Sequence, residues 1–393
     1  MPERQEIIDA LAKLAGEASA ALTNDALIDA DPALFRRARK AFGSWEDAVV
    51  AALCYTARGK KRRPSREEVV AEEHHQRQPQ DGWDGLICFA TADHCIFSVR
   101  GAELPTIHQI PATVVEFAPA GRTSKILAAL SNPDEKSVVL FSDKGLAYPL
   151  NGRVVPEANL PRRTVGDVTG MPSTDSVATI VPRADMQGGK RFVHTTTAGK
   201  TKASSVHDFG RNIDSGAVAF LLGPDDAVCS TFVEYRDHTG VFCASSGGNG
   251  IQYSNAEVRS MGLRAQGVKA MALGEFEALV GAEPVTGEEQ VVVLTMQGFG
   301  KRVSLREFRP QGRAGQGMIL LRPHEAGDEV AVMAVVRDLD SDILIWTSEG
   351  RYVRLAATAI PLLGRSQKAV AVLDIDSGER VTGTHVLPGS GPA

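Results

Sequence analysis

Lysine and arginine recur at matching places along the sequence, close to glycines. After one set of glycines stand Lys200, Lys202, Lys301, Arg302, Arg351 and Arg354. In or beside a second glycine-containing loop stand Arg162, Arg163, Arg211, Arg264, Lys269, Arg313, Arg365 and Lys368. Regularly spaced cations neutralise the phosphates of a nucleic-acid backbone, and glycine lets backbone N–H groups approach phosphates closely. The pattern predicts phosphate contacts without base recognition. The alternative is that the glycines form structural corners and the cations are solvated neighbours.

Motifs for catalysis and metal binding are missing from the sequence. It contains no Gly-x-Ser-x-Gly elbow, no phosphate-binding P-loop and no His-Glu-x-x-His pair. Its five cysteines are odd in number and form no Cys-x-x-Cys pair, which argues against a disulfide framework or a zinc site. We therefore expect a protein that is not an enzyme and that carries no metal and no cofactor.

Composition limits the classes of protein that fit. Of the 393 residues, 43% are hydrophobic and 23% charged, as in folded globular proteins, and the formal net charge is −5. No apolar run reaches the roughly 20 residues of a membrane span, and residues 1–17 lack the apolar stretch of a signal peptide, so we expect a cytoplasmic, nucleoid-associated protein. A net negative chain binds DNA only if its cations are segregated. We expect the acids in other loops, at Asp225, Asp226, Glu275, Glu277, Asp338, Asp340 and Asp342.

The elements that position these cations follow from an internal repeat. A short apolar run ending at an anchor residue recurs at His94, Gly145, Gly199, Gly248, Gly298 and Gly350, with spacings between 49 and 54 residues. An anchor glycine supplies the positive φ of a hairpin turn. A second signature, Gly-x-x-x-x-Gly, follows in later copies at residues 262–267 and 312–317. Four strands per unit, six times over, predict a mainly β, six-bladed propeller whose blades must stack to bury their faces.

The first 80 residues have a different pattern. Ile7, Ile8, Leu11 and Leu14 fall on one helical face, and Asp31-Pro32 is a helix start. A basic run at residues 58–66 follows and reads either as a second DNA contact or as a solvated linker. We expect a helical head and basic linker over residues 1–80 and the propeller over residues 84–389.

The two repeat signatures resemble the C-terminal domain of the A subunit of bacterial DNA gyrase and of its topoisomerase IV counterpart. The resemblance is carried by residues 295–318 and 347–368 and extends over residues 84–389. It implies a six-bladed β-pinwheel in which blades exchange strands and duplex DNA bends around the basic rim. Residues 31–48 resemble a helical repeat associated with homing endonucleases. A plain bundle of two or three helices explains them equally well.

Two departures from the gyrase pattern shape the expected function. The family's breakage-reunion domain and active-site tyrosine do not fit within 80 residues, and the one Arg-Tyr pair, Arg351-Tyr352, lies in a predicted strand. The family's Gln-Arg-Arg-Gly-Gly-Lys-Gly box is absent from the first blade, and its nearest echo is Gln311 to Gly317. We therefore expect non-catalytic, sequence-independent binding and bending or wrapping of duplex DNA. The alternative is a protein-interaction propeller that is an accessory to a topoisomerase or another DNA-processing complex.

Overall fold

The computed structural model describes Lys40 and residues 85–121, 123–131, 138–150, 155–182, 191–209, 215–323, 325 and 327–389. The chain divides into two compact parts, Met1–Gln80 and Asp81–Ala393. The expected helical head, the basic run at residues 58–66 and Arg211 lie outside the described residues. Apart from Lys40, all described residues belong to the second part, residues 81–393, which holds the six repeat units.

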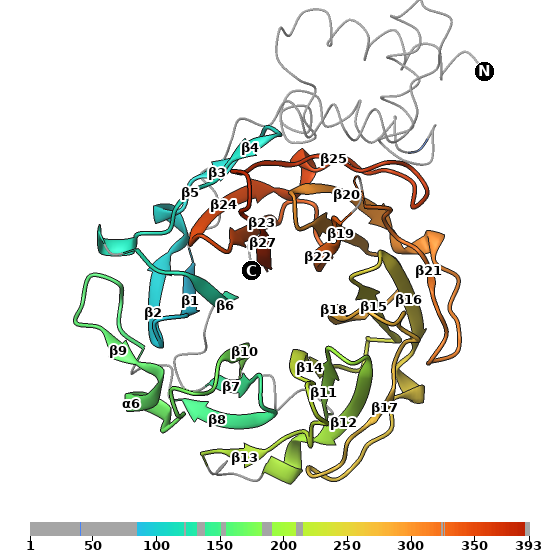
Figure 1. Ribbon diagram of the computed structural model, residues 1–393, viewed down its shortest axis with the longest axis horizontal. Coiled ribbons are helices and arrows are strands. Elements are labelled where there is room, and N and C mark those ends of the chain that lie inside the picture. Colours follow the sequence, from blue (N-terminus) through green and yellow to red (C-terminus); the bar gives the residue numbers. More distant parts are fainter. Residues whose placement is uncertain are drawn as a thin grey trace, which may run out of the picture. The chain divides into compact units, whose positions relative to one another are not determined.

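Six sheets stand side by side around a central axis, as the repeat predicts (Figure 1). In each repeat unit three strands form the inner part of a blade, and the last strand of the unit lies nearest the axis. These strands are β1 (Leu86–Thr91), β2 (Cys95–Arg100) and β6 (Ile126–Ser131) in blade 1, and β7 (Val138–Ser142), β8 (Leu146–Leu150) and β10 (Val177–Pro182) in blade 2. Blade 3 has β11 (Arg191–Thr196), β12 (Lys200–Ser205) and β14 (Val228–Glu234); blade 4 has β15 (Gly240–Ser245), β16 (Asn249–Ser254) and β18 (Leu279–Val285). Blade 5 has β19 (Gln290–Thr295), β20 (Phe299–Ser304) and β22 (Val330–Val336), and blade 6 has β23 (Asp342–Thr347), β24 (Arg351–Ala356) and β27 (Val381–Leu387).

The outermost strand of each blade comes from the next unit in the chain. These two-residue strands are β9 (Arg163–Thr164), β13 (Ala217–Val218), β17 (Val268–Lys269), β21 (Met318–Ile319) and β25 (Val370–Ala371) on blades 1 to 5. This exchange is the pinwheel arrangement that the resemblance implies. The mainly β, six-bladed prediction is confirmed, and helical structure in the described propeller is limited to short turns and to α6 (Val165–Thr169).

The outer edge of blade 6 is covered by the first unit, which closes the ring. An arm, residues 101–121, crosses to blade 6, where β3 (Thr106–Ile107) pairs with β24 in parallel and β5 (Val115–Glu116) pairs with it antiparallel. A further strand of the arm, β4 (Ala112–Thr113), pairs with β26 (Leu373–Asp374). The sixth blade is therefore sealed by chain that precedes it by more than two hundred residues.

Packing between neighbouring blades supplies the core. Each of six clusters of buried apolar side chains joins two adjacent sheets; Val292 and Leu294 of blade 5, for example, pack with Ile343 and Ile345 of blade 6. Phe89 of blade 1 shares a cluster with Leu344 of blade 6, so the closing interface is packed like the others. Burial on both faces removes the exposed side that a single sheet would have.

The anchor glycines adopt the backbone that the repeat predicted. Gly248 has φ +86°, and a Cβ there would lie 2.0 Å from the carbonyl oxygen of Leu321. A side chain is thus excluded by both conformation and space. His94, the non-glycine anchor, also takes a positive φ, of 60°.

Candidate nucleic-acid interface

The second glycine signature lies along the outer edge of the preceding blade. In unit 4 the chain runs beside β12, where Ala203 N–H donates to the Arg259 carbonyl (2.9 Å) and Met261 N–H donates to the Ala203 carbonyl (2.8 Å). It then pairs with β12 again as β17. We call such stretches rim segments; those on blades 1, 3, 4 and 5 are residues 157–164, 258–269, 308–319 and 360–371. Residues 215–218 are the described part of the segment on blade 2.

Two of the predicted phosphate-binding lysines are buried instead. Lys202 Nζ donates to the carbonyls of Gly262 (2.9 Å) and Leu263 (2.6 Å). Lys301 Nζ donates to the carbonyls of Gly364 (3.0 Å), Arg365 (2.8 Å) and Gln367 (2.8 Å). Burial lowers the pKa of Lys301 to about 8, so its amine is still mostly protonated at neutral pH. The expectation that these lysines lie on an exposed rim is wrong, because the next unit's rim segment covers them.

Arg302 and Arg354 are buried for the same reason. Arg302 donates from Nε to the Ile360 carbonyl, at the start of the next rim segment, and burial lowers its pKa to about 10. Arg354 forms an ion pair with Asp342 (2.7 Å) and donates from Nη1 to the Gly101 carbonyl (2.7 Å). Both guanidinium groups hold the segment that covers their blade, and neither is available to an external phosphate.

Two more predicted cations are paired with acids. Arg162 Nη1 lies 2.6 Å from Asp93 Oδ2. Arg351 contacts Asp376 (2.8 Å) and Glu379. The hydrogen bonds and the charge of Glu379 raise the pKa of Arg351 above its usual value. The neighbouring Tyr352 is buried and packs edge-on against Phe117, and burial raises the pKa of its hydroxyl.

The other described cations of the predicted set lie at the surface. Arg163, Arg264, Lys269 and Lys368 are exposed, and Lys200, Arg313 and Arg365 are half-buried. Lys200 and Lys269 are cross-strand partners on blade 3, and Arg313 Nη1 donates to the Lys269 carbonyl. The repeat therefore gathers cations from units 3, 4 and 5 at one place.

The sequence analysis missed two exposed arginines, Arg259 and Arg309. Each stands three residues before the first glycine of a Gly-x-x-x-x-Gly signature, at Gly262 and Gly312. This shared offset was visible in the sequence and places both side chains on rim segments of adjacent blades.

At two positions the backbone N–H group that was expected to approach a phosphate already donates to a carboxylate of the protein. Arg313 N–H donates to Glu257 Oε2 (2.8 Å), and Arg365 N–H donates to Glu307 Oε2 (3.0 Å). These carboxylates occupy equivalent places in adjacent units and fix the start of the rim loop. Phosphate contact through these loops therefore depends on side-chain charge.

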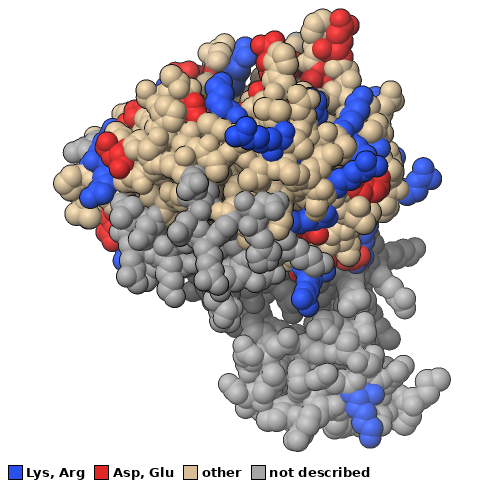
Figure 2. All heavy atoms as spheres, turned by 90° about the horizontal axis from the view of Figure 1, so that it is seen from below, with Lys and Arg blue, Asp and Glu red and all other residues tan. Residues whose placement is uncertain are grey.

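Other acidic residues lie away from the rim, at the hairpin turns formed by the anchors and in the loops that precede the innermost strands. We call this the hairpin-tip face. Asp226 Oδ1 accepts from Ala198 N–H (2.9 Å) across one turn, and Asp328 Oδ1 accepts from Gln297 N–H (3.2 Å) across another. Exposed acids of this face include Asp225, Glu275, Glu329, Glu349 and Asp376. Asp338 and Asp340 lie at the opposite end of the blades, whereas Asp342 is buried in β23. On the side visible in Figure 2, Lys and Arg stand in separate groups with Asp and Glu between some of them.

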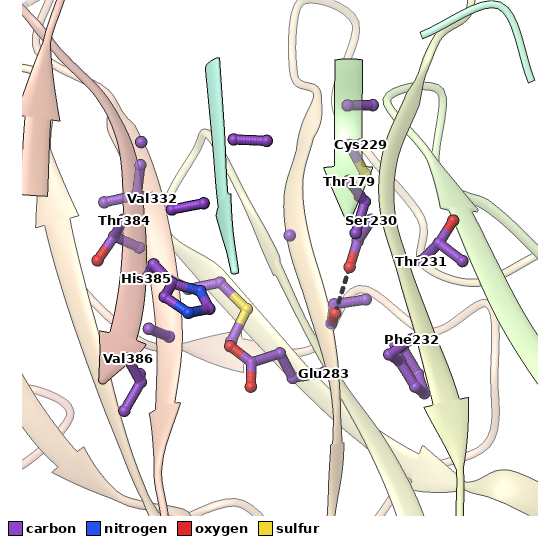
Figure 3. Close-up of a pocket in the computed structure, with 18 of the residues that line it drawn as sticks. Thr179, Cys229, Ser230, Thr231, Phe232, Glu283, Val332, Thr384, His385 and Val386 are labelled. Atoms are coloured by element: carbon purple, nitrogen blue, oxygen red, sulfur yellow. Dashed lines mark hydrogen bonds between the residues drawn. The ribbon is translucent and has the colours of Figure 1, made fainter. Parts of the chain in front are cut away.

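The propeller's central channel has a cavity of about 670 Å³, lined by the innermost strands (Figure 3). Burial raises the pKa of Glu283, whereas it lowers that of His385 to about 4. His385 Nε2 accepts the Ser131 N–H (3.0 Å), so at neutral pH this nitrogen carries no proton. Among the described residues no three His, Cys, Asp or Glu side chains are grouped as metal ligands, and no described helix is long and apolar enough to span a membrane.

A family model for the DNA gyrase C-terminal domain, a β-propeller, matches residues 241–286, 289–337 and 341–388. These stretches are units 4, 5 and 6, which carry the rim segments of blades 3, 4 and 5. Over these three stretches the chain is therefore similar to the DNA gyrase C-terminal domain family. The match to this gyrase-type propeller therefore includes both glycine signatures and the cations between them.

Curated relatives include gyrase A subunits, and solved structures of this kind share the fold. The chain is 28% identical over 260 residues to the A subunit of DNA gyrase from Ureaplasma parvum, covering 65% of this chain and 30% of that protein. It thus spans less than a third of the length of this curated relative. A solved gyrase A C-terminal domain superposes with a TM-score of 0.68 at 18% identity, covering 78% of this chain and all of that one. The topoisomerase IV C-terminal domain gives 0.61 at 19%, covering 77% and 93%. At these identities the structures support the fold alone.

Proposed function

We propose that this gyrase-type propeller binds duplex DNA through its phosphates, along the rim segments, and bends it without cleaving it. The observation that carries the proposal is the separation of charge. The predicted cations that are neither buried nor paired with an acid lie on rim segments or, for Lys200, on the strand next to one, whereas many exposed acids lie on the hairpin-tip face. Opposite charge along a curved edge attracts a phosphate backbone despite a net charge of −5.

Independence from base sequence is part of the proposal. Reading bases in the major groove requires an inserted helix or a two-stranded ribbon. In the described part of the propeller the longest helix is α6, with five residues, and the outer strands are two residues long. Side-chain cations on short loops suit phosphates, which are alike in every sequence.

Ligation of nicked plasmid in the presence of increasing amounts of the protein tests wrapping. After the protein is removed, the linking number is read on a gel. A progressive shift of the topoisomers that disappears at higher salt supports a chiral DNA path. A gel shift without a change in linking number supports binding without wrapping, and failure in both assays overturns the proposal.

A protein-interaction propeller is the second candidate, and one surface feature favours it. Phe276 is 89% exposed and stands between Glu275 and Glu277 on the hairpin-tip face. An exposed aromatic side chain among acids is a feature of protein-binding surfaces more than of DNA-binding ones. Purification of the tagged full chain after nuclease treatment tests this function: a stoichiometric protein partner that is lost with Phe276→Ser supports it, and recovery of the propeller alone counts against it.

A further inference from the structure

We propose that duplex DNA follows blades 3, 4 and 5 of this propeller and leaves the ring before blades 6 and 1. The inference rests on the proposed DNA-binding function and specifies which part of the rim carries it. It predicts a contact that is confined to consecutive blades rather than spread around the ring.

Blades 3 to 5 present several cations whose side chains form no ion pair with a described residue. Within the described residues, no ion pair involves the side chains of Lys200, Arg259, Arg264, Lys269, Arg309, Arg365 or Lys368. These side chains come from one β-strand and three equivalent rim segments, so the propeller symmetry places them on successive parts of the same edge. Free cations displace counterions from DNA, which is the main source of affinity without sequence recognition.

Continuity between blades comes from a direct contact. Lys200 and Lys269 stand opposite each other on neighbouring strands of blade 3, an arrangement in which like charges repel and so favour an anion between them. Arg313, on the rim segment of blade 4, donates to the carbonyl of Lys269. Cations of two blades thus form one group, with Arg309 and Arg365 further along the rim.

Blade 6 lacks such cations because the arm covers its edge. Residues 101–121 contain no Lys or Arg but include Glu103 and Glu116, both exposed. Thr106 of this arm donates to Asp342, and Arg354 is buried beneath it. A duplex that continued from blade 5 would therefore meet carboxylates without compensating positive charge.

Blade 1 offers little more. Arg162 is paired with Asp93 at 2.6 Å, and the charge of Arg163 helps to lower the pKa of Asp167 after the hydrogen bonds from Thr164. The two exposed arginines of this rim segment therefore have acids next to them. Among the described rim segments, the group of neighbouring cations therefore lies on blades 3, 4 and 5, whose rim segments come from the family-matched units.

The acids of the hairpin-tip face bound the path on one side. Asp225, Glu275 and Glu329 are exposed beside blades 3, 4 and 5. Phosphates are repelled from this face and attracted to the adjacent rim. Because six blades share the circle, the centres of blades 3 and 5 are about 120° apart. A duplex that contacts blades 3, 4 and 5 must therefore bend around the rim.

Two variants of the full chain that remove equal charge test the path. The path variant replaces five exposed cations of blades 3 to 5: R259Q, R264Q, K269Q, R309Q and K368Q. The control variant replaces five exposed cations outside blades 3 to 5: R100Q, K125Q, K144Q, R163Q and R380Q. Affinity for a 40-base-pair duplex is measured from 50 to 300 mM KCl, and thermal unfolding checks that each variant is folded. A third variant exchanges Lys for Arg and Arg for Lys at the five path positions.

The path variant is expected to bind at least about tenfold more weakly at 0.1 M salt, and its plot of log K against log salt should flatten by about 0.9 for each phosphate that is no longer neutralised. The control and the exchange variants should keep the native slope, since phosphate binding needs charge rather than a particular cation. If the control variant loses as much slope as the path variant, the path is wrong while DNA binding stands. If the native chain itself shows no salt-dependent binding, the proposed function fails as well.

Discussion

Lys301 Nζ lies 2.8 Å from the carbonyl oxygen of Arg365 and donates a hydrogen bond to it, although the two residues belong to different units. The same ammonium also donates to the carbonyls of Gly364 and Gln367. One buried cation of blade 5 thus fixes the loop that presents Arg365 and Lys368 at the surface. Lys202 does the same for the loop that presents Arg264.

Replacing Lys301 with Met should destabilise the propeller by about 2–4 kcal/mol. Hydrogen bonds from a charged donor contribute about 1.5–3 kcal/mol each, and the carbonyls left behind are only partly rehydrated. Lys368→Met removes an exposed lysine of the same loop and should change stability by no more than about 0.5 kcal/mol. Urea unfolding of both variants gives the comparison, and equal losses would show that the buried ammonium has no special role.

Loss of Arg354 should weaken ring closure. Its ion pair with Asp342 and its bond to the Gly101 carbonyl join blade 6 to the arm of the first unit. Arg354→Met leaves a buried carboxylate without its cation, which costs about 3–5 kcal/mol. Arg354→Met combined with Asp342→Leu removes the stranded charge, so the double variant should be more stable in urea than Arg354→Met alone. If the losses in unfolding free energy of Arg354→Met and Asp342→Leu simply added up in the double variant, this account would be contradicted.

The anchor glycines should differ sharply from glycines in open turns. Gly248→Ala places a methyl group 2.0 Å from the Leu321 carbonyl oxygen at φ +86°, so backbone strain of about 1–2 kcal/mol is increased by a steric clash. Gly378 has φ +90° with no atom within 4 Å of the added Cβ, so Gly378→Ala should cost the strain alone. Thermal unfolding should therefore show a clearly larger loss for Gly248→Ala, and a loss of equal size would mean that the close approach is relieved by small shifts.

Acid should destabilise the propeller through its buried histidines. Burial first, and the charge of Lys202 second, lower the pKa of His194 to about 3, below the value of about 6.5 in an unfolded chain. As the pH falls from 6.5 towards 3, His194 is therefore protonated in the unfolded state but stays neutral in the folded state. Stability is complete above pH 6.5 and declines by about 1.4 kcal/mol per pH unit for this group. His385, with a pKa of about 4, adds a similar decline down to pH 4.

His194→Phe isolates the first of these contributions. The ring is surrounded by Phe141, Phe192, Phe209 and Phe220, so phenylalanine fits the chemistry of the site. Loss of the hydrogen bond to Thr231 lowers stability at every pH. The diagnostic quantity is the slope of unfolding free energy between pH 6.5 and 4, which should become shallower by about 1.4 kcal/mol per unit. An unchanged slope would exclude His194 as the titrating group.

The sequence predicted the number of blades because each hairpin carries its own signal. A turn with positive φ favours glycine, and five of the six anchors are glycines that adopt it. The sixth, His94, takes the same backbone without being glycine, and it was found from the apolar run before it and from its spacing. The closing arm had no signal in the repeat, because residues 101–121 pair with strands of the last unit rather than with their own.

Side-chain burial could not be predicted at the same level. Lys301 and Arg302 are adjacent in a strand and point to opposite faces, so alternation predicts one side exposed. Both are buried, Lys301 completely, because the neighbouring unit's rim segment covers the strand edge and its carbonyls accept their hydrogen bonds. A basic residue in one unit and its acceptors in the next are more than fifty residues apart, and only the strand exchange brings them together.

Strand exchange also sets an order of events during synthesis. As the chain leaves the ribosome, each of the first five blades keeps an unpaired outer edge until the following unit has been made. Blade 6 is the exception, because the arm that covers β24 is translated long before β24 itself. The arm strands β3, β4 and β5 therefore have no pairing partner until β24 and β26 of the last unit have been made, and the pairing of the arm with blade 6 comes after the synthesis of the other blades.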